Sequence, residues 1–311
     1  MSSDGPGFLA TARYGKDKVR VFRTVRGTDG VHTIVEYIVT ALLEGALDVS
    51  YTQADNSVVV ATDSNLAKTS PHVLSPARFA VHLGTHLVSK YVHLTKAVVT
   101  VQQLRWARIG VDGAAHPHAF WRDGDEKRIV TAVVDKTADG AVATVEGGLK
   151  DLLVLKSTGS AFENFVRDEY TTLVEVNDRI FSTAVDLAYT YAPLAIAGHG
   201  DGKELDVKHV ATKSGDAWDD DQVATKAREI TLKVFATDDS ASVQATLYKM
   251  GQEILAANPA VMSVQISLPN KHYIPVDMKY IGLDNTTPSK AEVFVPVDAP
   301  SGLITASVAR A

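Results

Sequence analysis

The chain has 311 residues, of which 45% are hydrophobic and 22% are charged, so it can hold two ordinary domains and is unlike a disordered protein. Its net charge of −6 argues against non-specific binding of nucleic acid, which requires a positive field. There is no cysteine, which excludes disulfides and thiolate nucleophiles, and no apolar run approaches the roughly 20 residues of a membrane span.

The first half of the chain begins with side chains that are β-branched or alternate between charged and apolar, a pattern that predicts strands. Between the first two strands, Gly27-Thr28-Asp29-Gly30 is typical of a hairpin turn. A helix should follow Ser75-Pro76, with serine as the N-cap and proline at the first helical position. An apolar stripe on that helix comprises Phe79, Leu83, Leu87 and Tyr91. The predicted strands cover residues 18–23, 33–39, 56–62, 97–111 and 118–134.

The second half repeats this order. One helix should contain Val223 and Val234, and a second should start near Ser240, with Val243, Leu247, Met250 and Ile254 on one face. A loop rich in glycine and aspartate covers residues 197–202. The predicted strands cover residues 151–158, 179–191, 261–267 and 292–297.

Two successive strand–strand–helix–strand–strand units predict an α+β fold built from a duplicated module. We expect a flexible N-terminal tail over residues 1–13, a first module over 14–147 and a second over 148–311. Each sheet would expose its edges and one face, so we expect closure by oligomerisation.

The histidines give little support for a metal site. His82 and His86 have the i, i+4 spacing of zinc ligands, and His116 and His118 form a second close pair. Neither pair has the cysteines or carboxylates that would complete a ligand set, so surface or hydrogen-bonded core histidines are the better interpretation. Dinucleotide, nucleoside-triphosphate and serine-hydrolase motifs are also missing, and we expect no cofactor.

Residues 157–173 combine hydroxyl groups, two phenylalanines and an arginine in a segment too mixed for a core element. Arg179 follows at the start of a predicted strand. A guanidinium near the ring of Phe162 suits a flat, anionic heterocycle. Alternatively, Arg179 pairs with Asp178 or Glu175, and Phe162 packs under the loop.

The start of the last predicted helix offers further polar groups. With Ser240 as the N-cap, Val243 is about the third helical residue, and its N–H is one of the unpaired donors at a helix start. Together with the amide of Gln244, this N–H could bind an amide-like edge of a ligand that carries negative charge. Alternatively, Gln244 is an ordinary exposed residue.

The segment from Ser267 to Tyr273 places Asn270 and His272 directly after a predicted strand that stops at Pro269. Such a strand end can present polar groups to a cleft, although an ordinary polar turn explains it equally well.

These segments together resemble the urate oxidase (uricase) family over nearly the whole chain. The matching stretches, in order, are Tyr14-Gly15-Lys16, residues 59–63, residues 155–160 with Phe162, residues 167–173, Asp178-Arg179-Ile180, residues 243–248 and residues 267–273. The resemblance implies two tandem T-fold (tunnelling fold) modules, with antiparallel sheets carrying helices on one face. It also implies a homotetramer in which the sheets close into a barrel with a central tunnel.

The resemblance further implies an enzyme that oxidises urate with O₂ to 5-hydroxyisourate and H₂O₂, without a cofactor or metal, at sites between subunits. In that family pattern Phe162 stacks on urate, Arg179 and Gln244 hold it from either side, and the N–H of Val243 adds a contact. Asn270 lies above the ring, where O₂, water or peroxide sits. The neighbouring subunit supplies Thr62 and Asp63, and a proton relay comprises Lys16, Thr62 and His272.

Two segments depart from the family pattern, residues 64–69 and the loop at 197–202. Two alternatives remain: a purine-binding homo-oligomer without catalysis, and a T-fold enzyme that acts on pterins. The chain has no pattern of a signal peptide and ends in Ala309-Arg310-Ala311 rather than a peroxisomal Ser-Lys-Leu, so we expect a cytoplasmic protein.

Overall fold

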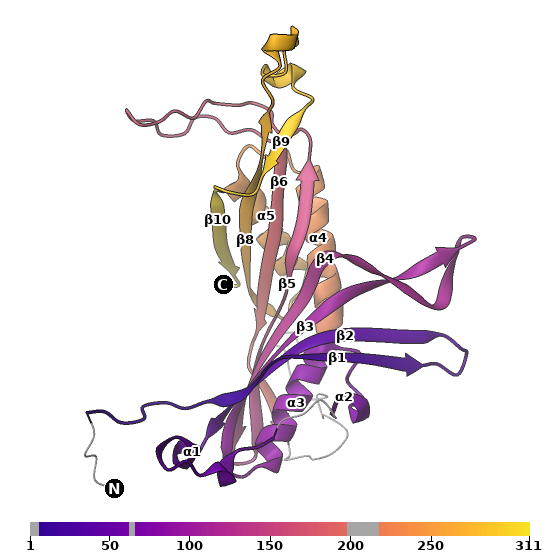
Figure 1. Ribbon diagram of the computed structural model, residues 1–311, viewed down its shortest axis with the longest axis vertical. Coiled ribbons are helices and arrows are strands. Elements are labelled where there is room, and N and C mark those ends of the chain that lie inside the picture. Colours follow the sequence, from indigo (N-terminus) through magenta and orange to yellow (C-terminus); the bar gives the residue numbers. More distant parts are fainter. Residues whose placement is uncertain (1–5, 62–65, 198–217) are drawn as a thin grey trace. The chain divides into compact units, whose positions relative to one another are not determined.

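The computed structural model describes residues 6–61, 66–197 and 218–311. Within this part of the chain, ten strands and five α-helices form an α+β fold whose paired strands run antiparallel (Figure 1). The predicted fold class is therefore confirmed. The chain divides into two compact units, the first comprising Met1–Gly148 and Thr190–Asp221, the second Leu149–Tyr189 and Gln222–Ala311.

In the first unit, neighbouring strands follow the order β1-β2-β3-β4-β5, and β7 pairs with the beginning of β5. Strand β1 pairs only with β2, so its other edge is open among the described strands. The elements are β1 (Tyr14–Arg26), β2 (His32–Gly45), α1 (Asp48–Thr52), α2 (Leu66–Thr69), α3 (Pro76–Lys90), β3 (Leu94–Val111), β4 (Ala114–Thr137), β5 (Gly140–Lys156) and β7 (Leu194–Ala197).

Helix α3 covers β3 and β4, and the core of the first unit lies between them. Gly84 lets the helix approach closely, because a Cβ there would lie 2.6 Å from Cγ2 of Val134. The predicted apolar stripe lies beside this contact. Phe79, Leu83, Leu87 and Tyr91 line a cavity of about 400 Å³ whose other wall comes from β1 and β2.

In the second unit, the strand order is β5-β6-β8-β10, and β9 pairs with the end of β8. Helices α4 and α5 run side by side, and α5 packs on β8 and β10. Both predicted helices are confirmed, and the predicted face of α5 is buried. The elements are β6 (Phe181–Tyr191), α4 (Asp220–Thr237), α5 (Val243–Ala257), β8 (Val261–Pro275), β9 (Phe294–Val297) and β10 (Leu303–Ala309).

The second unit repeats the close helix–sheet contact of the first. A Cβ at Gly251 of α5 would lie 2.6 Å from Cγ2 of Val308 on β10. A glycine that faces a valine of the sheet thus fixes the helix height in both units, which agrees with a duplicated module. The predicted module boundary at residues 147 and 148 lies within β5 and stays a prediction.

One predicted strand does not form. Within residues 56–61 the chain makes a short 3₁₀ turn, Asn56–Val58, followed by extended backbone without a strand partner. Asp55 fixes the turn by accepting a hydrogen bond from the Ser57 N–H at 2.9 Å, and the Tyr14 hydroxyl contacts the backbone N–H of Val60. Side chains therefore replace the ladder that the valine run predicted.

The strand that was expected to stop at Pro269 continues to Pro275. Pro269 lies opposite Leu303 of β10, and the same strand then pairs with β9 through His272 and its register partner Val297. The interpretation of residues 267–273 as a strand end or a polar turn is therefore wrong. Pro269 is the last residue of β8 that pairs with β10, so the proline falls at the end of that ladder, before the pairing with β9 begins.

No helix among the described residues is long and apolar enough to cross a membrane. Most of the loop predicted at residues 197–202 lies outside the described residues, and Ala197 is the last residue of β7.

Candidate active site

Phe162 lies in a loop that its own backbone closes. Its N–H donates to the carbonyl of Val176 at 2.7 Å, and the Val176 N–H donates back to Phe162 at 3.0 Å. The ring of Phe165 stacks on that of Phe162, with centroids 4.8 Å apart and an interplanar angle of 14°. Phe162 is partly exposed, so the loop presents an oriented aromatic face to which a flat ligand could add.

Arg179 lies two residues before β6, and its guanidinium carbon is 5.2 Å from the ring centroid of Phe162. Within the described part of the chain no carboxylate pairs with it. Asp178 instead accepts hydrogen bonds from the Thr158 hydroxyl and the Gly159 N–H, and Glu175 accepts from the Asn164 N–H. The alternative in which Arg179 neutralises Asp178 or Glu175 is therefore wrong.

The electrostatic setting of Arg179 favours an anion. Burial lowers the pKa of its guanidinium, yet an arginine in a protein stays protonated. The hydrogen bond from Thr158 keeps the pKa of Asp178 below its ordinary value, and that carboxylate is already used by the loop backbone. A partly buried cation without a counter-ion is a site that a bound anion would complete.

Helix α5 begins at Val243, and its N-cap is Ser242 rather than Ser240. The Ser242 hydroxyl accepts a hydrogen bond from the Ala245 N–H at 3.1 Å. The expected N-cap was therefore two residues too early, because Ser240 and Ser242 both have the preferred side chain and only the backbone geometry decides between them.

With Ser242 as the N-cap, Val243 is the first helical residue instead of about the third, but its backbone N–H is still a donor at the helix start. As the first helical residue, it has an N–H without a partner in the helix, and among the described residues we find no other acceptor for it. Gln244 follows in the first turn and is exposed. A backbone donor and a side-chain amide thus lie together at the positive end of a helix dipole.

Ser240 joins these two halves of the candidate site. Its N–H donates to the carbonyl of Gly159 at 3.0 Å, and its carbonyl accepts from the Ala161 N–H at 2.9 Å. On the other side of that segment, the Arg179 N–H donates to the carbonyl of Ser160 at 2.9 Å. Phe162, Arg179 and the start of α5 therefore share one short hydrogen-bonded framework, which brings together what the sequence placed far apart.

Asn270 and His272 lie on β8, on the face whose preceding residues Val264, Ile266 and Leu268 are buried. Oδ1 of Asn270 is buried and has no partner in the described structure. The backbone N–H of Asn270 donates to Gly302 at 2.8 Å, and a Cβ at Gly302 would press within 3.2 Å of its side-chain nitrogen. An unpaired buried amide oxygen requires water or a ligand.

The remaining predicted residues come from the first unit. Lys16 is exposed on β1 at a register shift in the β1–β2 pairing, and it also lines the 400 Å³ cavity beside α3. Thr62 and Asp63 lie outside the described residues.

The structure gives the clustered histidines another role. His82 is buried, its Nδ1 lies 2.8 Å from the Ser70 hydroxyl, and its ring packs against that of His72. In the parts of the chain that are described, no group of three histidine, aspartate or glutamate side chains could hold a metal ion.

Sequence reasoning missed two residues that support this site. Phe165 backs the ring of Phe162, and Lys156 contacts the turn that carries Ser240. The signal for Lys156 is its position: it continues a row of alternating residues in which Leu152 and Val154 are buried, where a lysine is unexpected.

The fold and this site define a class of protein: tandem α+β modules in which an aromatic ring, a helix N-terminus and a guanidinium without a carboxylate partner among the described residues lie on one hydrogen-bonded framework. A family model described as Uricase matches residues 12–133 and 145–305. The chain belongs to the uricase family.

Individual relatives agree with this assignment. The chain is 47% identical to a uricase of Emericella nidulans and 45% identical to a uricase of Aspergillus flavus, each over 310 residues that cover 97% of both proteins. It is also similar to the crystal structure of the uricase from Arthrobacter globiformis, with 32% identity and a TM-score of 0.77 over 98% of this chain and 96% of that one.

Proposed function

We propose that this chain is a urate oxidase that oxidises urate with O₂ and water to 5-hydroxyisourate and H₂O₂, using neither a metal nor an organic cofactor. Urate loses two electrons, which reduce O₂ to H₂O₂, and the oxygen of water adds to the purine ring. Membership of the uricase family supports the reaction. The observation that carries the assignment of the site is Arg179, a half-buried cation beside the ring of Phe162 that has no counter-ion among the described residues.

In this proposal the second unit holds the substrate. Urate stacks on Phe162, while Arg179 and the amide of Gln244 bind its edges and the N–H of Val243 adds a hydrogen bond. A guanidinium and a helix N-terminus stabilise the negative charge of an electron-rich ring without reorganising as the reaction proceeds. Asn270 lies above the ring, where O₂, water or peroxide sits, and its side-chain oxygen, which has no partner among the described residues, would accept a hydrogen bond from water or peroxide.

Protons move through Lys16, Thr62 and His272. An ammonium, a hydroxyl and an imidazole form a suitable series of donors and acceptors for general acid–base catalysis. His272 belongs to β8, whose pairing with both β9 and β10 holds that part of the chain in a defined register.

The site becomes complete in a homotetramer, in which a neighbouring copy supplies Thr62 and Asp63 and the sheets close into a barrel with a central tunnel. Among the described strands, β1 and β10 each have one edge without a partner, which supports this assembly because unpaired strands are natural points of strand addition. The cytoplasmic location expected from the sequence stays a prediction.

The reaction is tested by following the loss of the ultraviolet absorbance of urate and the appearance of H₂O₂ in the presence of a chelator. We expect turnover that survives chelation. Folded protein that binds urate under O₂ but does not consume it would contradict the proposal and favour the purine-binding alternative.

The shared site is tested by mixing two inactive variants, Arg179→Ala and Thr62→Ala, and allowing them to reassemble. If two chains form each site, some mixed interfaces regain both native residues and activity returns. A mass other than that of four chains in solution, or no activity after mixing, would contradict the assembly.

A further inference from the structure

Lys156 is the last residue of β5 and points to the interior of the second unit. It continues the buried row of Leu152 and Val154, and its ammonium lies 5.8 Å and 5.7 Å from the ring centroids of Phe181 and Phe235. Burial lowers the pKa of Lys156, while the charges of Asp238 and Asp239 oppose that shift. A lysine at such a position requires strong partners.

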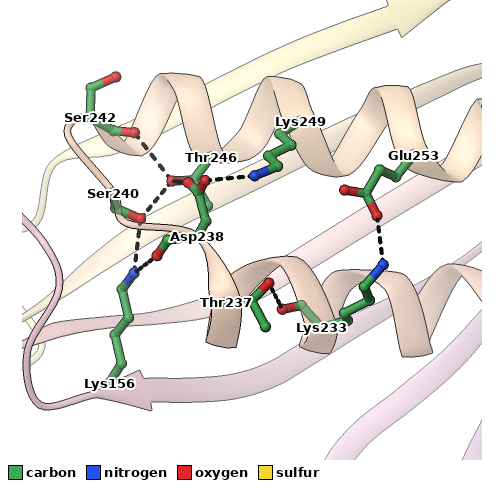
Figure 2. Close-up of polar contacts among 9 residues, drawn as sticks. All are labelled: Lys156, Lys233, Thr237, Asp238, Ser240, Ser242, Thr246, Lys249 and Glu253. Atoms are coloured by element: carbon green, nitrogen blue, oxygen red, sulfur yellow. Dashed lines mark hydrogen bonds and ion pairs between the residues drawn. The ribbon is translucent and has the colours of Figure 1, made fainter.

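Those partners lie in the connection between α4 and α5 (Figure 2). Nζ of Lys156 donates to the backbone carbonyl of Asp238 at 2.7 Å and to the Ser240 hydroxyl at 3.0 Å. The Asp238 carbonyl follows the last residue of α4, so the ammonium also lies at the negative end of that helix.

From Ser240 the series of hydrogen bonds continues to Thr246 in α5. The Ser240 hydroxyl lies 2.6 Å from that of Thr246, which donates in turn to the carboxylate of Asp238 at 2.6 Å. Ser240 and Thr246 are both buried. Burial raises the pKa of the Asp238 carboxyl, but the bonds from Thr246 and Lys249 outweigh burial and lower it overall. This series of hydrogen bonds therefore leads from the ammonium of Lys156 to the carboxylate of Asp238, and both hydroxyl groups in it are paired.

The turn that Lys156 holds is the one that joins both halves of the candidate site. Ser240 contacts the backbone of Gly159 and Ala161, which precede Phe162, and three residues later α5 begins with Val243 and Gln244. A shift of Ser240 would therefore change the distance between the aromatic ring and the start of the helix.

We propose that Lys156 is a positioning residue, which does not touch the substrate. It sets the distance between two parts of the site: the pair Phe162 and Arg179, and the start of α5 at Val243 and Gln244. The inference rests on the proposed function, because it assigns Lys156 to the same urate site. A site whose contact groups are held in place before the ligand arrives binds more tightly, so a residue that holds the spacing affects binding from a distance.

The test compares Lys156→Met with the native enzyme. Methionine keeps much of the stem and removes the ammonium, so we expect the protein to fold and the dissociation constant of urate, measured by titration without O₂, to rise about tenfold, the scale of one charge-assisted hydrogen bond. We expect kcat at saturating urate to change by less than about twofold, because ground-state positioning acts mainly on binding.

Lys249→Met is the matched control. Lys249 contacts the other oxygen of the Asp238 carboxylate at 3.0 Å, is half exposed and has no contact with Ser240. The Lys249→Met variant should bind urate as the native enzyme does. An equal loss of binding in Lys249→Met, or unchanged binding in Lys156→Met, would overturn the proposal.

A double-mutant cycle with Gln244→Ala separates positioning from general loss of stability. If Lys156 acts through the start of α5, the penalty of Gln244→Ala is smaller in the Lys156→Met background; additive penalties would overturn the proposal. Should Lys156→Met not fold, Ser240→Ala removes the same link more gently and must show the same coupling to Gln244→Ala.

Two variants distinguish failure of the proposed urate site from failure of the proposal for Lys156. If Arg179→Ala binds urate normally, the assignment of the urate site is wrong. If Arg179→Ala loses binding and Lys156→Met does not, only the role of Lys156 is wrong.

Discussion

Helices α3 and α5 each pack on the sheet of their unit and directly precede a strand, β3 and β8, but the two helices begin in different ways. Helix α3 begins with Pro76, which has no N–H, after Ser75, whose hydroxyl is buried and makes no capping hydrogen bond. Helix α5 begins with Val243, whose N–H is unpaired, after Ser242, whose hydroxyl caps Ala245. One helix has no N–H at its first position, whereas the other has an N–H there that lacks a partner among the described residues.

The two units share a helix–sheet contact but differ at the start of the helix. Both helices lie on their sheets at the same close contact, through Gly84 and Gly251, so the scaffold is alike. What differs is the first helical residue, which supplies a backbone N–H in α5 and none in α3. We therefore expect substitutions in the second unit to change binding of urate and the substitution of Lys16 in the first unit to change turnover.

The largest effect should come from Arg179→Ala. Removing the guanidinium should weaken urate binding by roughly 3 kcal/mol, about 150-fold, because a charge-assisted contact in a partly buried site is lost. Titration with urate in the absence of O₂ measures the dissociation constant. Arg167→Ala is the control, since Arg167 is exposed and lies over Phe165 rather than Phe162. Near-native binding by the Arg179 variant would remove it from the site.

Lys16→Met should lower kcat by about 100-fold, the usual scale of general acid–base catalysis, and leave urate binding nearly unchanged. Steady-state rates and the anaerobic titration separate the two effects. Lys90→Met, which removes another ammonium from the wall of the same cavity, should keep native turnover. If kcat of the Lys16 variant stays native, Lys16 is not part of the relay.

Val243→Pro converts the start of α5 into that of α3 and addresses the comparison directly. Ser242 has φ −152° and ψ 146°, which suits a residue before proline, so the helix should form. Loss of one donor to an anion should weaken urate binding about tenfold.

Val243→Ala is the matched control for this change, because it also shortens the buried side chain but keeps the N–H. The two variants should have similar melting temperatures and different affinities. Equal affinities would show that the free N–H contributes nothing to binding.

The smallest effect concerns the histidines beside α3. Burial, with the nearby charges of His72 and His86, lowers the pKa of His82 from its ordinary 6.5 to about 4. Between those values the unfolded chain binds the proton and the folded chain does not, so stability rises with pH through this range and falls as the pH drops. The melting temperature should follow this slope. His82→Gln should flatten it, and an unchanged slope would assign the pH dependence to other groups.

Much of the fold follows from local patterns in the sequence. The 3.6-residue period of Val243, Leu247, Met250 and Ile254 predicted α5, and all four side chains are buried. The valine run at residues 58–60 misled, because side-chain contacts of Asp55 and Tyr14 replace strand pairing there. Pro269 misled for a related reason: only the register with β10 reveals that the strand continues.

The family resemblance supplies the residues proposed for the second-unit site, whereas the framework beneath them could not be predicted. Local sequence gives no sign that Ser240 bonds to Gly159 and Ala161, since those contacts join segments about 80 residues apart. In the proposed homotetramer Lys16 and Thr62 act together with His272 only through pairing between chains, which local sequence patterns do not encode.

Among the described strands, β1 and β10 have open edges, which bear on how the proposed homotetramer would be lost during storage. A chain separated from its neighbours would display rows of unsatisfied backbone groups, which recruit other strands indiscriminately. Dilution should then lead to precipitation instead of a reversible equilibrium between active and inactive forms. Shelf life would be governed by how fast subunits part, so a covalent link across a strand edge should protect the protein more than a better-packed core.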